Sequence, residues 1–261
     1  MMEFNTTTIN FFEIQPYFFF YVIGIVFASS LFILLLLKFN FNISRYTKIY
    51  FLSVIGLLAG AKLFGILTGL FNAIVNNEKI TLNTFLHTGI VFYGGLIGFI
   101  LSYLLICKLW NKYIEYRVID IVAVCIPMFH FWGRLSCFFS GCCYGKENYS
   151  NISVLYTNRI NNEIVTLPRV PIQLIEAGCN LFIMTFLMIL LFKRKYEKRI
   201  LIIYICMYAI LRIILELFRG DISRGIWNGI SFSQFVSAAI LIIIASLIIR
   251  IKYKEKIHEI Y

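Results

Sequence analysis

The stretch that decides the fold runs from Tyr17 to Lys38 and reads YFFFYVIGIVFASSLFILLLLK. It carries no charge before Lys38, and a helix needs about 20 apolar residues to cross the hydrocarbon core of a bilayer. Lipid offers no partner for an unpaired backbone amide, so such a stretch is expected to be helical. Six further apolar stretches follow at about 49–75, 89–109, 118–138, 172–193, 199–219 and 229–250. The sequence therefore predicts an all-α, polytopic integral membrane protein with seven transmembrane helices.

The composition supports this fold class and excludes a soluble globular protein. Of the 261 residues, 60% are hydrophobic and only 14% are charged, whereas in soluble domains about a quarter are charged. No long polar stretch separates the apolar ones, so residues 1–261 are expected to form a single membrane-embedded domain.

Basic residues are distributed unevenly over the connections between the apolar stretches. The first, third and fifth connections and the C-terminal tail together hold 15 Lys and Arg, whereas the N-terminus and the other connections hold 6. By the positive-inside rule the N-terminus lies outside, the C-terminus is cytoplasmic, and the long connection at about 139–171 is external. The formal net charge of +11 thus follows from topology and implies no nucleic-acid partner.

Six ionisable residues fall inside the predicted helices, where an unpaired charge costs at least about 2.5 kcal/mol. They are Lys62, Asp120, Arg134, Glu176, Arg212 and Glu216. Because three are basic and three are acidic, one interpretation is that they only pair and clamp helices together. The other interpretation is a functional site.

The spacing of the polar residues favours a site, because they form three stripes at helical spacing. The stripes are His130, Arg134, Cys137 and Gly141 on the fourth helix, Gln173, Glu176 and Asn180 on the fifth, and Tyr208, Arg212, Glu216 and Arg219 on the sixth. On the predicted topology Arg134, Glu176 and Arg212 lie in the external half of the membrane. Converging stripes predict a cavity open toward the outer leaflet, and guanidinium groups suit the phosphate of an anionic phospholipid headgroup.

Glycines interrupt the second and third helices. Gly56 and Gly60 are four residues apart, which is typical of close packing between helices. Directly after Tyr93 comes a second group, which comprises Gly94, Gly95 and Gly98. Because glycine lets a ligand approach the backbone, we expect this second group to contact a ligand or to leave room for a lipid chain.

A cysteine cluster at Cys137, Cys142 and Cys143 allows several interpretations. Together with His130 it offers four potential metal ligands, but adjacent cysteines fit one tetrahedral zinc ion poorly and a Cys-x-x-Cys pair is absent. We therefore predict no metal. A disulfide involving Cys137 and a transient carrier thiol remain alternatives to simple packing among small residues.

Short motifs follow one another in order along nearly the whole chain. They are Tyr17 with Tyr21-Val-Ile-Gly24, Gly60-Ala-Lys62, Tyr93-Gly-Gly-Leu-Ile-Gly98, Gly133-Arg134 through Gly141 to Gly145, Pro171 with Gln173 and Glu176, Arg212 with Glu216 and Arg219, and Gln234. In this order they resemble the motifs of the prolipoprotein diacylglyceryl transferases, with departures at Lys62, at Tyr93 and at the cysteine cluster.

The resemblance implies a multi-pass transferase of the bacterial cytoplasmic (inner) membrane with its active site toward the outer leaflet. In that reaction the diacylglyceryl group moves from phosphatidylglycerol to the thiol of the lipobox cysteine in the signal peptide of an exported prelipoprotein. Glycerol 1-phosphate is released. The implied partners are phosphatidylglycerol, the prelipoprotein and membrane lipids, and no cofactor takes part.

This chemistry suggests roles for residues of the predicted cavity. Arg134 and Arg212 are expected to bind the phosphate, and Glu216 is expected to orient an arginine by pairing. Arg219 is expected nearer the surface, where it would meet the headgroup or the entering peptide. The other candidates for substrate binding are Tyr17, Gly94, Gly95, Gly98, Cys137, Gly145, Gln173 and Glu176.

The general base has two candidates. Tyr93 stands where the family has a histidine, and a phenol, whose ordinary pKa is about 10, is a weak base at neutral pH. His130 lies one helical turn from Arg134 and is the natural substitute, while a histidine that only packs is the alternative.

Three other interpretations stay open. The first is a diverged phospholipid-dependent transferase with another acceptor. The second is a transporter of an anionic solute that uses the arginines for selectivity. The third is a structural membrane module whose charges only pair with one another.

Overall fold

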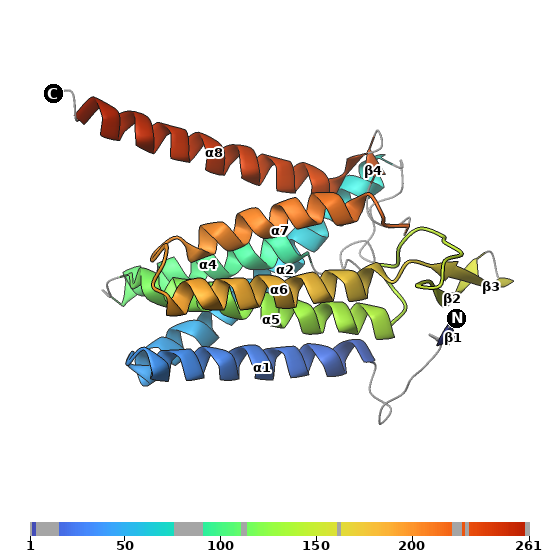
Figure 1. Ribbon diagram of the computed structural model, residues 1–261, viewed down its shortest axis with the longest axis horizontal. Helices are drawn as coiled ribbons and strands as arrows, with labels where there is room; N and C mark the ends of the chain where they lie inside the picture. The colour runs from blue at the N-terminus through green and yellow to red at the C-terminus, as the bar shows by residue number, and fades with distance from the viewer. Residues whose placement is uncertain are drawn as a thin grey trace. The chain divides into compact units, whose positions relative to one another are not determined.

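The structure, a computed structural model, describes most of the chain (Figure 1). The described residues are 2–3, 16–75, 91–110, 114–160, 163–220, 226–227 and 230–258, of which 2–3, 16–17, 72, 75, 158–160, 163–164, 226–227 and 251–258 are described by their backbone alone.

Helices make up most of the described chain. They are α1 (Pro16–Lys38), α2 (Ile43–Val75), α4 (Phe92–Leu109), α5 (Tyr116–Phe139), α6 (Ile172–Phe192), α7 (Ile200–Glu216) and α8 (Phe232–His258). Each coincides with one of the predicted apolar stretches. The main differences are that α2 begins at Ile43 and α8 ends at His258, because polar and charged residues continue these helices beyond their apolar parts.

The lengths of the helices confirm a polytopic membrane protein. In the described chain α1, α2, α4, α5, α6 and α8 are long and apolar enough to cross a membrane. Helix α7 has 17 residues and is therefore about 26 Å long, slightly less than the hydrocarbon core of about 30 Å. A seventh crossing by α7 stays a prediction, as does the orientation of the two termini.

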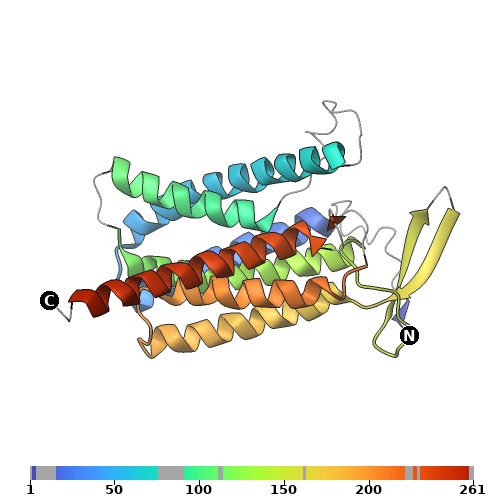
Figure 2. The same cartoon turned by 90° about the horizontal axis from the view of Figure 1, so that it is seen from above.

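Strands accompany the helices, which the sequence analysis did not predict. One sheet has the order β1 (Met2–Glu3), β2 (Val154–Ile160), β3 (Glu163–Arg169), with β1 and β2 parallel and β2 and β3 antiparallel. A second pairs β4 (Ile226–Trp227) with β5 (Ile230–Ser231). The β2–β3 hairpin projects beyond the ends of α5 and α6 in both views (Figures 1 and 2). Its alternation places Val154 and Tyr156 in the interior.

The chain divides into two compact units. The first comprises residues 1–32 and 119–261, and the second comprises residues 33–118. Helices α1 and α5 each continue from one unit into the other, and the prediction of a single domain over 1–261 stays a prediction.

In the second unit, glycines let α2 and α4 approach closely. A Cβ atom at Gly94 would lie 2.5 Å from the carbonyl oxygen of Gly60, and one at Gly98 would collide with the carbonyl oxygen of Gly56. The expected packing role of Gly56 and Gly60 is confirmed. Gly94 and Gly98 are their partners in this packing, so their predicted contact with a ligand finds no direct support here and stays a prediction.

In the first unit, Asp120 near the start of α5 ties that helix to α7. Its carboxylate accepts hydrogen bonds from the backbone amides of Lys198 and Ile200, the latter at 3.0 Å. These amides lie at the N-terminus of α7, where a negative charge is favourable. Asp120 therefore has the pairing role that the structural interpretation assigned to it.

The glycine contacts between α2 and α4 give a prediction for stability. Gly98→Ala places a methyl group against backbone, which cannot move out of the way as a side chain can, and overpacking of this kind costs about 1–3 kcal/mol. We expect a lower midpoint of thermal unfolding in detergent than for the wild-type protein.

Gly178→Ala on α6 is the matched control, because a Cβ atom there meets nothing within 4 Å. Alanine is the better helix former by about 1 kcal/mol, so its midpoint should equal or exceed that of the wild type. Equal midpoints for Gly98→Ala and Gly178→Ala would contradict the packing described above.

Candidate functional site

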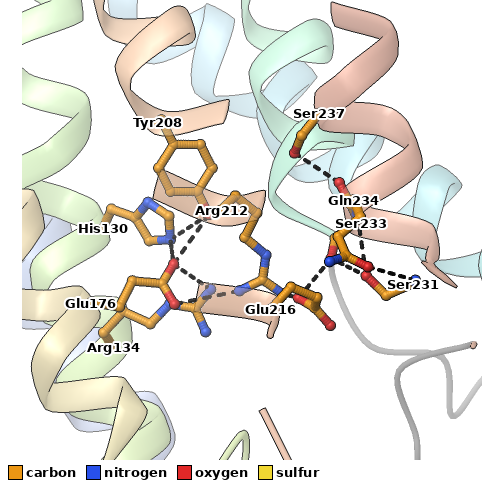
Figure 3. Close-up of polar contacts among 10 residues, drawn as sticks. All are labelled: His130, Arg134, Glu176, Tyr208, Arg212, Glu216, Ser231, Ser233, Gln234 and Ser237. Carbon is orange, nitrogen blue, oxygen red and sulfur yellow. Dashed lines mark hydrogen bonds and ion pairs between the residues drawn. The ribbon is translucent and has the colours of Figure 1, made fainter. Parts of the chain in front are cut away.

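Glu176, in the second turn of α6, lies at the centre of a buried polar network (Figure 3). Its side chain is only 2% exposed. One carboxylate oxygen, Oε1, lies 2.9 Å from Nη2 of Arg134 on α5, and the other, Oε2, lies 3.4 Å from Nη1 of Arg212 on α7. Two arginines from two helices therefore converge on the two oxygens of one carboxylate.

Glu216 extends this network to the start of α8. Nη2 of Arg212 lies 2.8 Å from Oε2 of Glu216, one turn further along α7, and the Ser233 hydroxyl donates to the same oxygen at 2.8 Å. Glu216 therefore pairs with an arginine as expected, and its orienting role in the reaction stays a prediction.

Ser233 is held in place by a capping box at the start of α8. The backbone N–H of Gln234 donates to the Ser231 hydroxyl at 3.2 Å. In return, the backbone N–H of Ser231 donates to the side-chain oxygen of Gln234 at 3.0 Å. This reciprocal pair satisfies two amides at the helix terminus. Figure 3 shows these residues beside Glu216.

His130 and Tyr208 complete the network on the side of Oε1. The Tyr208 hydroxyl donates to Glu176 Oε1 at 3.3 Å and lies 3.4 Å from Nε2 of His130. The same ring nitrogen lies 3.8 Å from Glu176 Oε1. Both side chains are buried, so the imidazole belongs to the same polar cluster as the arginines.

The charges of the network balance. Arg134 and Arg212 contribute two positive charges, and Glu176 and Glu216 contribute two negative charges. The ion pairs do not use every hydrogen-bond donor of the arginines. A guanidinium has five N–H groups, and Nε of Arg134 has no hydrogen-bond partner among the described residues. The network can therefore hold its arginines in place and still bind an anion.

The segment after α5 folds over the beginning of α6. Helix α5 ends at Phe139, and Gly141 then takes a φ of 67°, which corrects the prediction that Gly141 continues the polar stripe of this helix. The amide of Gln173 donates to the Cys142 carbonyl oxygen at 2.6 Å and accepts a hydrogen bond from the Tyr156 hydroxyl at 3.1 Å. Burial raises the pKa of Tyr156, which keeps this phenol protonated as a donor.

A backbone ladder joins this segment to the chain after α7. Gly145 donates to the Val170 carbonyl oxygen at 2.9 Å, and Lys146 donates to the Phe218 carbonyl oxygen at 2.8 Å. A Cβ atom at Gly145 would lie 2.6 Å from that Val170 oxygen, so only glycine fits without a shift.

Arg219 pairs with Gly145 in this ladder and is only 6% exposed. Helix α7 ends at Glu216, because the chain turns into the ladder. This corrects the expectation that Arg219 continues the helical stripe, whereas its place nearer the membrane surface stays a prediction.

The thiols of Cys137, Cys142 and Cys143 gather beside Arg134 and Arg219. Their sulfur atoms all lie within 4.8 Å of one another. Hydrogen bonds from the Cys137 and Cys142 thiols, together with the charges of the two arginines, hold the pKa of Cys143 well below its usual range. The pKa of Cys142 is raised by its two thiol neighbours and by burial.

Comparison with known proteins now identifies the family. A family model described as prolipoprotein diacylglyceryl transferase matches residues 5–250. The chain belongs to the prolipoprotein diacylglyceryl transferase family. The resemblance found in the sequence is thereby confirmed.

Individual relatives agree with the family model. The phosphatidylglycerol–prolipoprotein diacylglyceryl transferase of Clostridium tetani is 32% identical over 79% of this chain and 80% of the relative. A second enzyme of this name from Clostridium perfringens is 28% identical over 88% of each chain. The enzyme of Campylobacter jejuni is 28% identical over 97% of this chain and 96% of the relative.

The structure of this family member brings together those predicted site residues that lie in the first unit. The network unites His130, Arg134, Glu176, Arg212 and Glu216. Gln173, Gly145 and Arg219 position the loops beside it. Tyr93, Gly94, Gly95 and Gly98 belong to the second unit, and the side chain of Tyr17 lies outside the described residues.

Sequence reasoning missed Tyr156 and Ser233. Tyr156 lies on an unpredicted strand, and its alternation with Val154 was the available signal. Ser233 stands within the Ser-x-x-Gln pattern at 231–234, which is a recognisable signature of a helix N-terminus.

The network predicts that Glu176→Gln lowers stability. The substitution keeps the size of the side chain but removes the negative charge that two buried guanidinium groups share, and such losses cost about 3–5 kcal/mol. We expect a clear fall in the midpoint of thermal unfolding in detergent.

Glu147→Gln is the control, since Glu147 is exposed and substitutions at exposed sites change stability by about 0.5 kcal/mol or less. If Glu176→Gln unfolds at the same temperature as Glu147→Gln, the carboxylate charge does not hold the arginines.

Proposed function

We propose that the chain transfers the diacylglyceryl group of phosphatidylglycerol to the thiol of the lipobox cysteine of an exported prelipoprotein. The observation that carries the proposal is the convergence of Arg134 and Arg212 on the two oxygens of Glu176 in a member of this family. The relatives are named for this reaction and match most of the chain.

Arg134 and Arg212 recognise the phosphate in this proposal. Arginine suits phosphate because its N–H groups form a planar fork that matches two oxygens. Glu176 fixes the positions of both guanidinium groups, and the remaining N–H groups face the anion. Arg219 adds a positive charge near Glu176, so the site as a whole has a net attraction for a phosphodiester.

The reaction forms a carbon–sulfur bond and breaks a carbon–oxygen bond. The cysteine sulfur attacks the glyceryl carbon that carries the phosphate, and the phosphate oxygen leaves with the electron pair as glycerol 1-phosphate. A base removes the thiol proton. Since negative charge grows on the leaving phosphate, the two guanidinium groups stabilise the transition state more than the ground state.

His130 is the proposed base, with Tyr93 as the alternative. His130 lies in the network itself, 3.4 Å from Tyr208 and 3.8 Å from Glu176, which fixes its ring beside the arginines. Imidazole is the side chain that most often serves as a general base. Tyr93 retains the family position before the double glycine.

Gly145, Gln173, Cys137 and Arg219 are proposed to shape the substrate site. Gln173 and Gly145 hold the loops next to the network. Cys137 lies one turn beyond Arg134 on α5. The predicted substrate contacts of Tyr17, Gly94, Gly95 and Gly98 belong to the same proposal.

The site is proposed to open toward the outer leaflet of the bacterial inner membrane. Arg134 lies near the C-terminal end of α5, Glu176 near the N-terminal end of α6 and Arg212 near the C-terminal end of α7. These ends adjoin the connections that are poor in Lys and Arg, which the positive-inside rule assigns to the outside. When α7 is counted as a span, the chain crosses the membrane seven times, with the N-terminus outside and the C-terminus in the cytoplasm.

A direct assay tests the proposed function. The purified protein is incubated in detergent with phosphatidylglycerol labelled in its acyl chains and a peptide that contains a lipobox cysteine. We expect a thioether-linked diacylglyceryl peptide and release of glycerol 1-phosphate, both detected by mass spectrometry. A peptide with serine in place of the cysteine should remain unmodified, and absence of product with the cysteine peptide would contradict the proposal.

In this assay we expect Arg134→Lys and Arg212→Lys to lower kcat/KM by about 10²–10³-fold, because lysine keeps the charge but loses the fork. Arg199→Lys, at an exposed position, is the matched control and should retain wild-type activity. Full activity in either of the first two variants would show that the phosphate is bound elsewhere.

The assay also decides between the two bases. We expect His130→Ala and Tyr93→Phe to differ in rate by more than tenfold, which corresponds to about 1.4 kcal/mol of barrier, with His130→Ala the slower. The rates are compared under saturating phosphatidylglycerol. Similar small losses in both variants would assign the base to another group.

A further inference from the structure

Three thiols that are not reacting groups of the proposed transfer form a cluster at the C-terminal end of α5 and in the loop that follows it. Cys137 lies near the end of α5, and Cys142 and Cys143 follow in the loop. All three are free, half-buried cysteines, and their sulfur atoms all lie within 4.8 Å of one another. Three sulfur atoms at this spacing can bind one metal ion together.

The backbone explains how adjacent cysteines face the same point. Gly141 has a φ of 67° and Cys143 a φ of 61°, so the chain reverses twice within three residues. A non-glycine residue in this left-handed region is uncommon and costs free energy. The Cys142 thiol donates to the Cys137 carbonyl oxygen at 3.6 Å, which turns it back toward the end of α5.

The number of ligands fits a trigonal ion better than a tetrahedral one. Metal–sulfur bonds of about 2.3 Å place three sulfurs around a trigonal ion about 4.0 Å apart, which lies within the separations found here. Among the described residues no His, Asp or Glu joins the three cysteines as a fourth ligand. Structural zinc sites take four protein ligands, whereas copper(I), one of the ions that soft thiolates select, is satisfied by three.

The surrounding charges favour such a site. A copper(I) ion bound by three thiolates carries a net charge of −2. Arg134 and Arg219 both act electrostatically on Cys143, so this negative charge would lie beside two guanidinium groups.

We propose that Cys137, Cys142 and Cys143 form a three-thiolate site that binds one copper(I) ion. Binding exchanges the thiol protons for the ion and involves no change of oxidation state. No sulfur of the three takes part in bond making or breaking in the proposed transfer reaction, although Cys137 and Arg134 adjoin both sites.

The test uses the full chain, purified in detergent, reduced and kept anaerobic. Copper(I) is titrated against a chromophoric copper(I) chelator, and the bound ion is examined by X-ray absorption at the copper edge. We expect one ion per chain, with three sulfur neighbours. Cys142→Ser and Cys143→Ser should each weaken binding by at least about tenfold.

Cys179→Ser and Cys206→Ser are the matched controls, because these half-buried free cysteines lie on α6 and α7 outside the group. Both should retain wild-type affinity. The absorption spectrum of the wild-type protein tests the site even if a variant fails to fold.

Several outcomes would overturn the proposal. They are loss of all copper to the chelator, nitrogen or oxygen neighbours in the spectrum, and equal binding by the variants and controls. Preference for zinc over copper(I) at the same cysteines would also overturn it, as would a disulfide among the three in anaerobically purified protein.

Discussion

The carboxylate of Glu176 is the constraint on which the rest of the first unit depends. Two guanidinium groups, from α5 and α7, contact its two oxygens. These contacts fix how far α5, α6 and α7 are shifted along, and rotated about, their axes relative to one another. Arg212 then fixes Glu216, which fixes Ser233 and the start of α8. Buried ion pairs are a weak source of stability compared with apolar packing. Four charges at one depth are therefore better explained by the need to bind a charged group than by the need to join helices.

Backbone hydrogen bonds, together with the side chain of Gln173, assemble the loops beside this network. The segment around Gly145 pairs with Val170 before α6 and with Phe218 after α7, so three segments from two connections share one ladder. A Cβ atom at Gly145 or Gly220 would collide with the backbone of a neighbouring segment. Because backbone amides and carbonyls of this region form hydrogen bonds with one another, its side chains remain available to interact with the network and with ligands.

The sequence predicted the helices and the members of the network well, because both depend on local pattern. Hydropathy identifies membrane helices, and helical spacing placed Arg134, Glu176 and Arg212 on inward faces. Helical spacing gave wrong predictions at the ends of helices. Gly141 and Arg219 lie beyond the ends of α5 and α7, and hydropathy does not locate these ends. The approach of Gly94 and Gly98 to α2 and the left-handed backbone at Cys143 are tertiary features. The prediction of no metal relied on the adjacency of the cysteines and on the absence of a Cys-x-x-Cys pair, and no observation tests it.

A neutral network is a suitable host for an anionic substrate. If the arginines were unpaired in the apolar membrane, each would carry a large desolvation cost and would have no fixed orientation. Paired with Glu176 and Glu216, they keep their positions before the substrate arrives, so little reorganisation accompanies binding. Nε of Arg134 has no partner among the described residues, and Arg219 adds a positive charge nearby. An incoming phosphate therefore finds donors and charge without having to displace the carboxylates that hold the site together.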